Sequence, residues 1–169
     1  AAPCRFADTD AAEVVARDLD GQTILYRGVR YRYPLIGTHQ LKNFVLILTA
    51  VEALREAGWQ IPEDAVHTAL SRVRWPGRFE IVCKKPVIVL DGAHNADGIK
   101  EFIRTVVGVQ EHRSVSLLFS AVVEKEYEKM IAEICESVHP TSIVVTQIDG
   151  ARVVPAEVLS GVFRLSLIH

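Results

Sequence analysis

The chain has 169 residues, of which 49% are hydrophobic and 24% are charged, a balance typical of a globular domain rather than a disordered or collagen-like chain. Its 19 Lys and Arg and 21 Asp and Glu give a formal net charge of −2, so it lacks the basic excess that binding to a nucleic-acid backbone requires. Nucleic acid is therefore excluded as the expected partner. The length allows one domain, or one domain that carries part of another.

The cysteines and the apolar segments indicate the compartment. Cys4, Cys83 and Cys135 form no Cys-x-x-Cys pair, which argues against a disulfide framework or a zinc ribbon. The apolar runs are short or interrupted by charges, and no signal peptide precedes them, so no membrane partner is expected. We therefore expect a cytoplasmic protein. The sequence starts at Ala1 without Met, which fits processing of the N-terminus or, equally, a piece of a longer polypeptide.

The first 73 residues predict a small antiparallel meander followed by two helices. Residues 13–36 hold three β-rich runs separated by glycine-containing turns. Residues 37–58 carry apolar side chains at helical spacing, which predicts a mostly buried helix whose apolar face includes Leu46 and Ile47. A shorter helix is expected to begin at Pro62. Residues 1–73 are thus predicted to be the incomplete end of a sheet-and-helix domain.

Residues 74–169 show strands and helices in alternation. Strands are predicted at residues 79–82, 87–90, 115–119 and 142–146, and amphipathic helices after the last three of them. Such alternation requires parallel strands joined by right-handed crossovers and covered by helices. The predicted fold class is therefore α/β, with a Rossmann-like, mostly parallel sheet and flanking helices in residues 74–169, preceded by a partial meander and two helices.

The strand at residues 87–90 ends in the polar turn Asp91-Gly92-Ala93-His94-Asn95. The strand is expected to be buried on both faces, and ligands bind at the carboxyl ends of strands in open parallel sheets. The following helix N-terminus attracts anions, so a phosphate or a carboxylate is expected at the turn. Simple capping of the helix by Asp97, or by Asn95 itself, is the alternative. One glycine instead of three disfavours NAD binding.

Three further positions are candidates for ligand contacts. Arg78 lies in a Pro-Gly turn that would project its guanidinium toward phosphate oxygens, although an ordinary surface role is as common. Asn43 lies near the start of the long helix, where capping or core packing is the alternative. Lys125 follows the strand at residues 115–119, where a solvated helix turn is the alternative. Asp91 and His94 are too few ligands for a metal, so no metal site is predicted.

Four motifs occur in one order along the chain: Gly37-x-His39-Gln40-x-x-Asn43, Trp75-Pro76-Gly77-Arg78-Phe79-Glu80, Leu90-Asp91-Gly92-Ala93-His94-Asn95 and Glu124-Lys125-Glu126-Tyr127. In order and spacing they resemble the folylpolyglutamate synthases and bifunctional dihydrofolate synthases of the Mur ligase superfamily, over nearly the whole chain. The resemblance implies an enzyme in which ATP, assisted by Mg²⁺, phosphorylates a carboxylate of a folate or of dihydropteroate. The amine of L-glutamate then attacks the acyl phosphate to form an amide.

The resemblance also implies roles for individual residues. Nucleotide contacts are expected from Asn43, Arg78, Asp91 and Asn95, glutamate contacts from Asp91, His94 and Lys125, and catalytic roles for Arg78 and His94. Asn43 resembles the residue near the adenine and Arg78 the one that reaches the phosphates. His94 resembles a residue implicated in glutamate binding and in closure of the site.

The sequence departs from the family pattern at several places. It contains no Gly-x-x-x-x-Gly-Lys-Ser/Thr phosphate loop, so that loop and the Mg²⁺ ligands are expected in an N-terminal ATPase domain of the same polypeptide. The chain is also expected to lack the family's final strand, and Phe44 stands where a small residue is usual. We therefore expect the C-terminal portion of a ligase, inactive by itself. The resemblance implies that residues 1–73 are the incomplete end of the central ATPase domain and that residues 74–169 are the C-terminal Rossmann-like ligase domain.

Three alternatives stay open. A Mur peptidoglycan ligase would use an acceptor that carries UDP, and a non-catalytic binding module would have kept the fold without the chemistry. A stand-alone α/β enzyme for small molecules would need a complete pocket within these residues.

Overall fold

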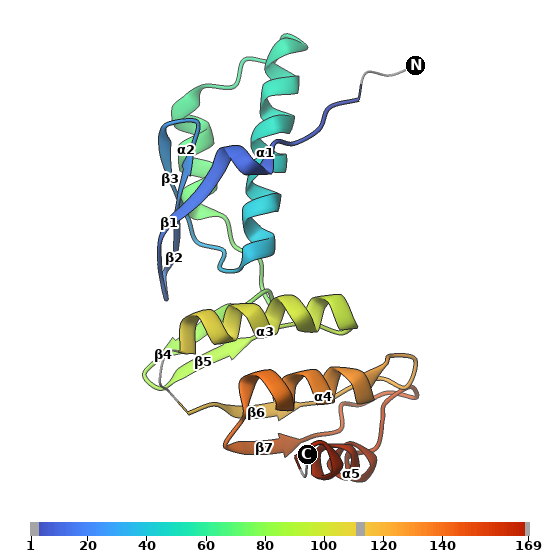
Figure 1. The fold of residues 1–169 in the computed structure, drawn as a ribbon. Helices are drawn as coiled ribbons and strands as arrows, with labels where there is room; N and C mark the ends of the chain where they lie inside the picture. The colour runs from blue at the N-terminus through green and yellow to red at the C-terminus, as the bar shows by residue number, and fades with distance from the viewer. Residues whose placement is uncertain (1–3, 111–113, 168–169) are drawn as a thin grey trace. The chain divides into compact units, whose positions relative to one another are not determined.

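The protein is described here by a computed structural model that covers residues 4–110 and 114–167. The expectations about the start at Ala1 and the end at His169 fall on residues outside these ranges. Contacts group the chain into two compact units, Ala1–Asp91 and Gly92–His169, and each is described by itself. Figure 1 shows the elements in chain order. The domain boundary between residues 73 and 74 stays a prediction.

The first unit begins with the predicted meander and helices. A short 3-10 helix (η1, Thr9–Ala11) precedes the strands β1 (Ala12–Asp18), β2 (Gly21–Tyr26) and β3 (Val29–Tyr33), and the helices α1 (Thr38–Glu56) and α2 (Glu63–Arg72) follow. The strands form an antiparallel sheet in the order β1-β2-β3. Helix α2 packs against β3 and α1 against β1. The predicted order of elements is confirmed.

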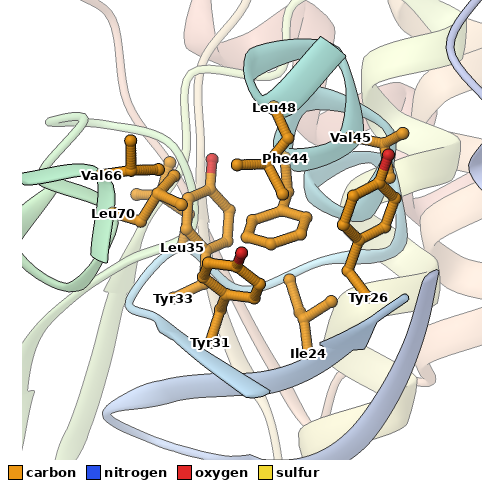
Figure 2. Close-up of a cluster of buried hydrophobic side chains, with 10 residues drawn as sticks. All are labelled: Ile24, Tyr26, Tyr31, Tyr33, Leu35, Phe44, Val45, Leu48, Val66 and Leu70. Atoms are coloured by element: carbon orange, nitrogen blue, oxygen red, sulfur yellow. The ribbon is translucent and has the colours of Figure 1, made fainter. Parts of the chain in front are cut away.

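Phe44 lies at the centre of the core of this unit (Figure 2). Its ring makes edge-to-face contacts with Tyr31, Tyr33 and Tyr26, at centroid distances of 5.2, 5.4 and 6.2 Å. The tyrosines come from β2 and β3 and Phe44 comes from α1, so this cluster joins the sheet to the helix. The large side chain at position 44 is therefore matched by an aromatic sheet face.

The prediction that α1 is mostly buried is wrong for one side of the helix. Phe44, Val45 and Leu48 are buried, but Leu46 is 56% exposed and Ile47 is 39% exposed. A helix that packs on one sheet buries one stripe, and each residue turns the side chain by about 100° around the axis. Leu46 and Ile47 therefore point away from the core that holds Phe44.

The first unit ends in an antiparallel hairpin of β4 (Glu80–Lys84) and β5 (Val87–Leu90). The prediction that residues 87–90 are buried on both faces is wrong, because Val87, Ile88 and Leu90 are 39%, 45% and 51% exposed. In this unit β5 is one strand of a two-stranded hairpin, which is too small to cover both faces of a strand.

The second unit alternates helices and strands, in the order α3 (Ala96–Gln110), β6 (Ser116–Phe119), α4 (Tyr127–Val138), β7 (Ser142–Val145) and α5 (Ala156–Ser166). Strands β6 and β7 pair in parallel, as the alternation predicts. The helices pack as α3 on α4 and α4 on α5, over buried side chains such as Ile131, Ile134 and Leu159. The α/β class is confirmed, with helices flanking sheets that are smaller than expected.

Candidate functional site

Arg78 occupies the last position of a tight turn just before β4. The Arg78 N–H donates to the carbonyl of Trp75 (3.2 Å), with Pro76 second and Gly77 third at a φ of 68°. Proline at the second position and a positive φ at the third define a type II turn. The half-buried Arg78 side chain places its guanidinium carbon 5.5 Å from the centre of the Trp75 ring. The turn therefore presents a cation on an aromatic surface.

Asp91 follows β5, at the end of the same hairpin. Its Oδ2 atom accepts a hydrogen bond of 2.7 Å from the backbone N–H of Phe79, the residue after Arg78. The structure thus brings Arg78 and Asp91, which are 13 positions apart, to one end of the β4–β5 hairpin.

His94 is exposed in the segment that leads into α3. Its Nδ1 atom lies 2.8 Å from the carbonyl oxygen of Gly92. Because a carbonyl oxygen can only accept, Nδ1 carries the proton and donates in this bond. In the neutral ring the Nε2 atom is then an acceptor, able to bind an ammonium or to take a proton.

Asn95 is the residue directly before α3, and its side chain caps the helix. The Asn95 Oδ1 atom accepts the N–H of Gly98 (2.8 Å), and its carbonyl accepts the N–H of Ile99 (2.9 Å). A Cβ atom on Gly98 would lie 3.0 Å from that Oδ1 atom, so glycine permits the close approach. Helix capping, the alternative to ligand binding, therefore accounts for the Oδ1 atom of Asn95. The sequence analysis did not predict this role of Gly98, although a glycine three positions after a capping Asn could have indicated it.

Asn43 lies half-buried on α1, within a hydrogen-bonded group of side chains. Its Nδ2 atom donates to Oε1 of the buried Gln40 (3.1 Å), and Nε2 of Gln40 lies 3.0 Å from Nε2 of His39. An amide held in this way keeps a second N–H and a carbonyl oxygen for other partners. Gln40 therefore orients Asn43.

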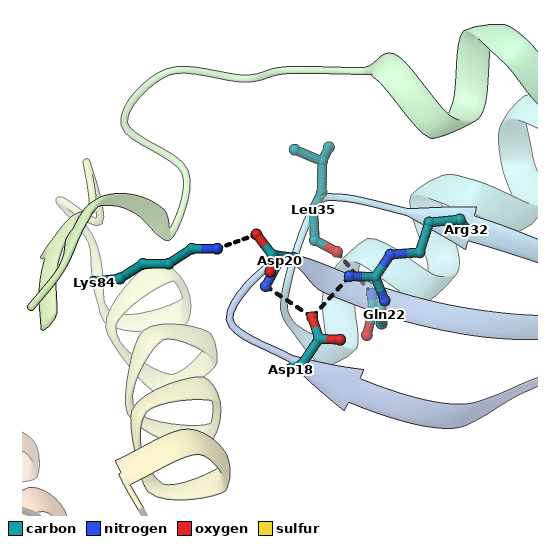
Figure 3. A network of polar contacts seen from close by, with 6 residues as sticks. All are labelled: Asp18, Asp20, Gln22, Arg32, Leu35 and Lys84. Atoms are coloured by element: carbon teal, nitrogen blue, oxygen red, sulfur yellow. Dashed lines mark hydrogen bonds and ion pairs between the residues drawn. The ribbon is translucent and has the colours of Figure 1, made fainter.

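Gln22 holds the backbone segment that leads into α1, a role that the sequence did not reveal. Its side chain on β2 is fully buried, and its Nε2 atom donates to the carbonyl of Leu35 at 2.9 Å (Figure 3). The same Nε2 atom lies 3.4 Å from the carbonyl of Gly37, the residue just before α1. A buried amide in a strand gave no periodic signal. The same view shows Asp18, which accepts from the Asp20 N–H and from Arg32, and the ion pair of Asp20 with Lys84.

Lys125 lies half-buried in the turn between β6 and α4. The glutamates on either side have other cationic partners: Glu124 pairs with Arg152 (3.2 Å), and Glu126 pairs with Lys129. The hydrogen bond from Lys129 holds the pKa of Glu126 below its usual value. The carboxylates next to Lys125 in sequence are therefore engaged elsewhere.

A cavity in the first unit is lined by other residues. It measures about 180 Å³ between β2, β3, α1 and α2, and it is lined by the ion pairs Arg27–Glu52 (2.8 Å) and Arg55–Glu63 (2.9 Å). None of the predicted site residues lines it.

Within residues 4–110 and 114–167, no three or more His, Cys, Asp or Glu side chains gather in a way that could hold a metal ion. Over the same ranges, no helix combines the length and the apolar character needed to cross a bilayer.

The family model for the glutamate ligase domain of Mur ligases matches residues 77–166. The dihydrofolate synthase/folylpolyglutamate synthase of Bacillus subtilis is 39% identical over 101 residues, which are 59% of this chain and 24% of that protein. The solved structure of Mycobacterium tuberculosis folylpolyglutamate synthase complexed with ADP superposes with a TM-score of 0.76 at 28% identity, covering 93% of this chain and 36% of that one.

A relative of another substrate class is also similar. The UDP-N-acetylmuramoyl-tripeptide–D-alanyl-D-alanine ligase of Treponema pallidum is 33% identical over 88 residues, which are 52% of this chain and 18% of that protein. The chain thus spans no more than about a quarter of the length of these curated relatives.

Proposed function

Because the chain belongs to the Mur ligase family, whose glutamate ligase domain its residues 77–166 match, we propose that it works as part of an ATP-dependent ligase of the folylpolyglutamate and dihydrofolate synthase type. The reaction joins L-glutamate to a folate, or to dihydropteroate, through an amide bond. These residues act together with an ATPase domain of the same polypeptide. ATP, with Mg²⁺, supplies the phosphoryl group that activates the acceptor carboxylate.

The observation that carries the proposal is the position of the Arg78 side chain. Its guanidinium is held on a type II turn and against the Trp75 ring, at the beginning of the segment that matches the family. A planar fork of N–H donors suits phosphate oxygens, and a positioned cation stabilises the charge that develops during phosphoryl transfer. Arg78 therefore binds nucleotide phosphate and contributes to catalysis.

The remaining nucleotide contacts are assigned to amide side chains. Gln40 orients the Asn43 carboxamide, and the groups that an oriented asparagine keeps are those that read an adenine edge. Asn95 uses its Oδ1 atom as a helix cap, so a nucleotide contact from this residue falls to its side-chain N–H group. The Mg²⁺ ligands are assigned to the ATPase domain.

Glutamate is assigned to groups of the second unit. The Nε2 atom of His94 accepts from the glutamate ammonium and takes the proton that the amine must lose before it attacks. The ammonium of Lys125 pairs with a glutamate carboxylate. Asp91 is the remaining candidate for a contact with either ligand, in addition to its hydrogen bond with the Phe79 N–H.

A chimera tests the proposal directly. This chain would replace the superposable segment of the Mycobacterium tuberculosis folylpolyglutamate synthase, and ADP release would be followed with ATP, tetrahydrofolate and L-glutamate. We expect release that requires all three substrates. Arg78→Ala should lower kcat/KM by roughly 100-fold or more, because one transition-state contact is removed. Arg74→Ala, an exposed cation of the same segment, is the matched control and should leave the rate unchanged.

A peptidoglycan ligase is the second candidate, favoured by the similarity to the Treponema pallidum protein. The chimera would be offered a UDP-linked muramoyl tripeptide and D-alanyl-D-alanine. ADP release with this pair and none with folate would replace the first proposal with the second. A chimera that folds, binds ADP and turns over neither pair would support a non-catalytic module.

A further inference from the structure

The β4–β5 ladder ends next to Phe79, whose backbone leaves the extended conformation. Glu80 pairs with Leu90 in the last step of the ladder, so Phe79 and Asp91 would form the next pair. Phe79 instead has a φ of 44°, in the left-handed region that residues with a Cβ rarely adopt. The Phe79 side chain is only 4% exposed, and its burial helps to keep the backbone in this left-handed conformation.

The Asp91 carboxylate binds the backbone of Phe79 just beyond the end of the ladder. Its Oδ2 atom accepts the Phe79 N–H at 2.7 Å, in a charge-assisted hydrogen bond. On the other side of the turn, Oε2 of Glu80 accepts the Gly77 N–H at 2.9 Å. Two carboxylates therefore hold the N–H groups of Gly77 and Phe79, the residues before and after Arg78.

We propose that Asp91 is a positioning residue for Arg78: by holding the left-handed Phe79 through its N–H, it fixes the backbone that presents the Arg78 guanidinium to nucleotide phosphate. Asp91 thus acts on the nucleotide through Arg78. The phosphate part of this inference rests on the proposed function, whereas the effect on Arg78 is a property of the chain alone.

A direct role of the Asp91 charge makes a different prediction. Asp91→Asn keeps an oxygen that can accept the Phe79 N–H but removes the charge, whereas Asp91→Ala removes both. If Asp91 positions Arg78, the Asn variant resembles the original protein and the Ala variant does not. If the carboxylate charge itself binds a ligand, both variants lose function equally.

The first test measures Arg78 in this chain by NMR. The ¹⁵N relaxation of the Arg78 Nε group and the hydrogen exchange of the Phe79 amide would be compared in the original protein, Asp91→Asn and Asp91→Ala. We expect Asp91→Ala to make Arg78 Nε as mobile as that of the exposed Arg74 and to speed Phe79 exchange at least tenfold. Asp91→Asn should rescue both. The matched control is Asp149→Ala, an exposed acid outside the hairpin.

The second test measures kinetics in the chimera. Asp91→Ala and Arg78→Ala should each lower kcat/KM for ATP, and the double variant should lose no more than Arg78→Ala alone, since Asp91 acts through Arg78. Unchanged Arg78 mobility in Asp91→Ala, in a protein whose core amides are intact, would overturn the inference, and so would fully additive kinetic losses. Loss of ligase activity in every chimera would count against the proposed function and leave the NMR result standing.

Discussion

Replacing Phe44 by alanine removes the side chain that joins α1 to the sheet of the first unit. Phe44 is 0% exposed and makes edge-to-face contacts with Tyr26, Tyr31 and Tyr33. A buried Phe→Ala change costs about 3–5 kcal/mol, through lost transfer free energy and the cavity that remains. Because three aromatic pairs, each worth about 0.5–1.5 kcal/mol, are lost as well, we expect a value near the upper end of that range.

The assay is native-state hydrogen exchange of the amides of Ile24 and Val45, because two compact units need not unfold in one step. We expect their free energy of opening to fall by about 5 kcal/mol in Phe44→Ala. Leu46→Ala on the same helix, at a position 56% exposed, should change it by less than about 0.5 kcal/mol. Equal losses in both variants would refute the role given to Phe44.

Two further predictions concern a titration and a helix cap. Burial, followed by the hydrogen bond to Glu63, raises the pKa of Tyr31 to about 12 in the folded protein, compared with about 10 in the unfolded chain. The protonated hydroxyl therefore contributes stability that is fully present below a pH of about 10 and is lost as the pH rises toward the folded pKa. Glu63→Gln should bring the Tyr31 pKa partway down in a tyrosine NMR titration; an unchanged pKa would exclude the contribution of Glu63. Gly98→Ala would place a Cβ 3.0 Å from the capping oxygen of Asn95, whereas the same change at Gly161 in α5 meets nothing within 4 Å. Gly161→Ala should therefore raise the free energy of unfolding by about 0.5–1 kcal/mol, and Gly98→Ala should lower it by about 1 kcal/mol as the cap weakens; equal gains would contradict the account of the cap.

Local pattern was enough to predict the order of the elements. The stripe from Ile99 to Val107 predicted α3, because a helix must bury one face at its own period of 3.6 residues. The motifs around Arg78, Asp91 and His94 likewise marked polar turns at the ends of strands. These features are encoded in residues close together in sequence, so they can be read without a fold.

Burial and pairing could not be predicted in this way. Leu46 and Ile88 have core-type side chains, yet both are exposed, because burial depends on which surfaces another element covers. The buried amide of Gln22 gave no periodic signal, and its carbonyl partners lie 13 and 15 positions away.

The sequence by itself determined the family motifs, the alternation of strands and helices, and the identity of the candidate side chains. Only the tertiary structure decided what those side chains contact: Asn95 caps α3, Gln40 orients Asn43, and Asp91 accepts the N–H of Phe79. The physical reason is that residue type fixes which hydrogen bonds a group can make, whereas the backbone path fixes which partner comes within about 3 Å.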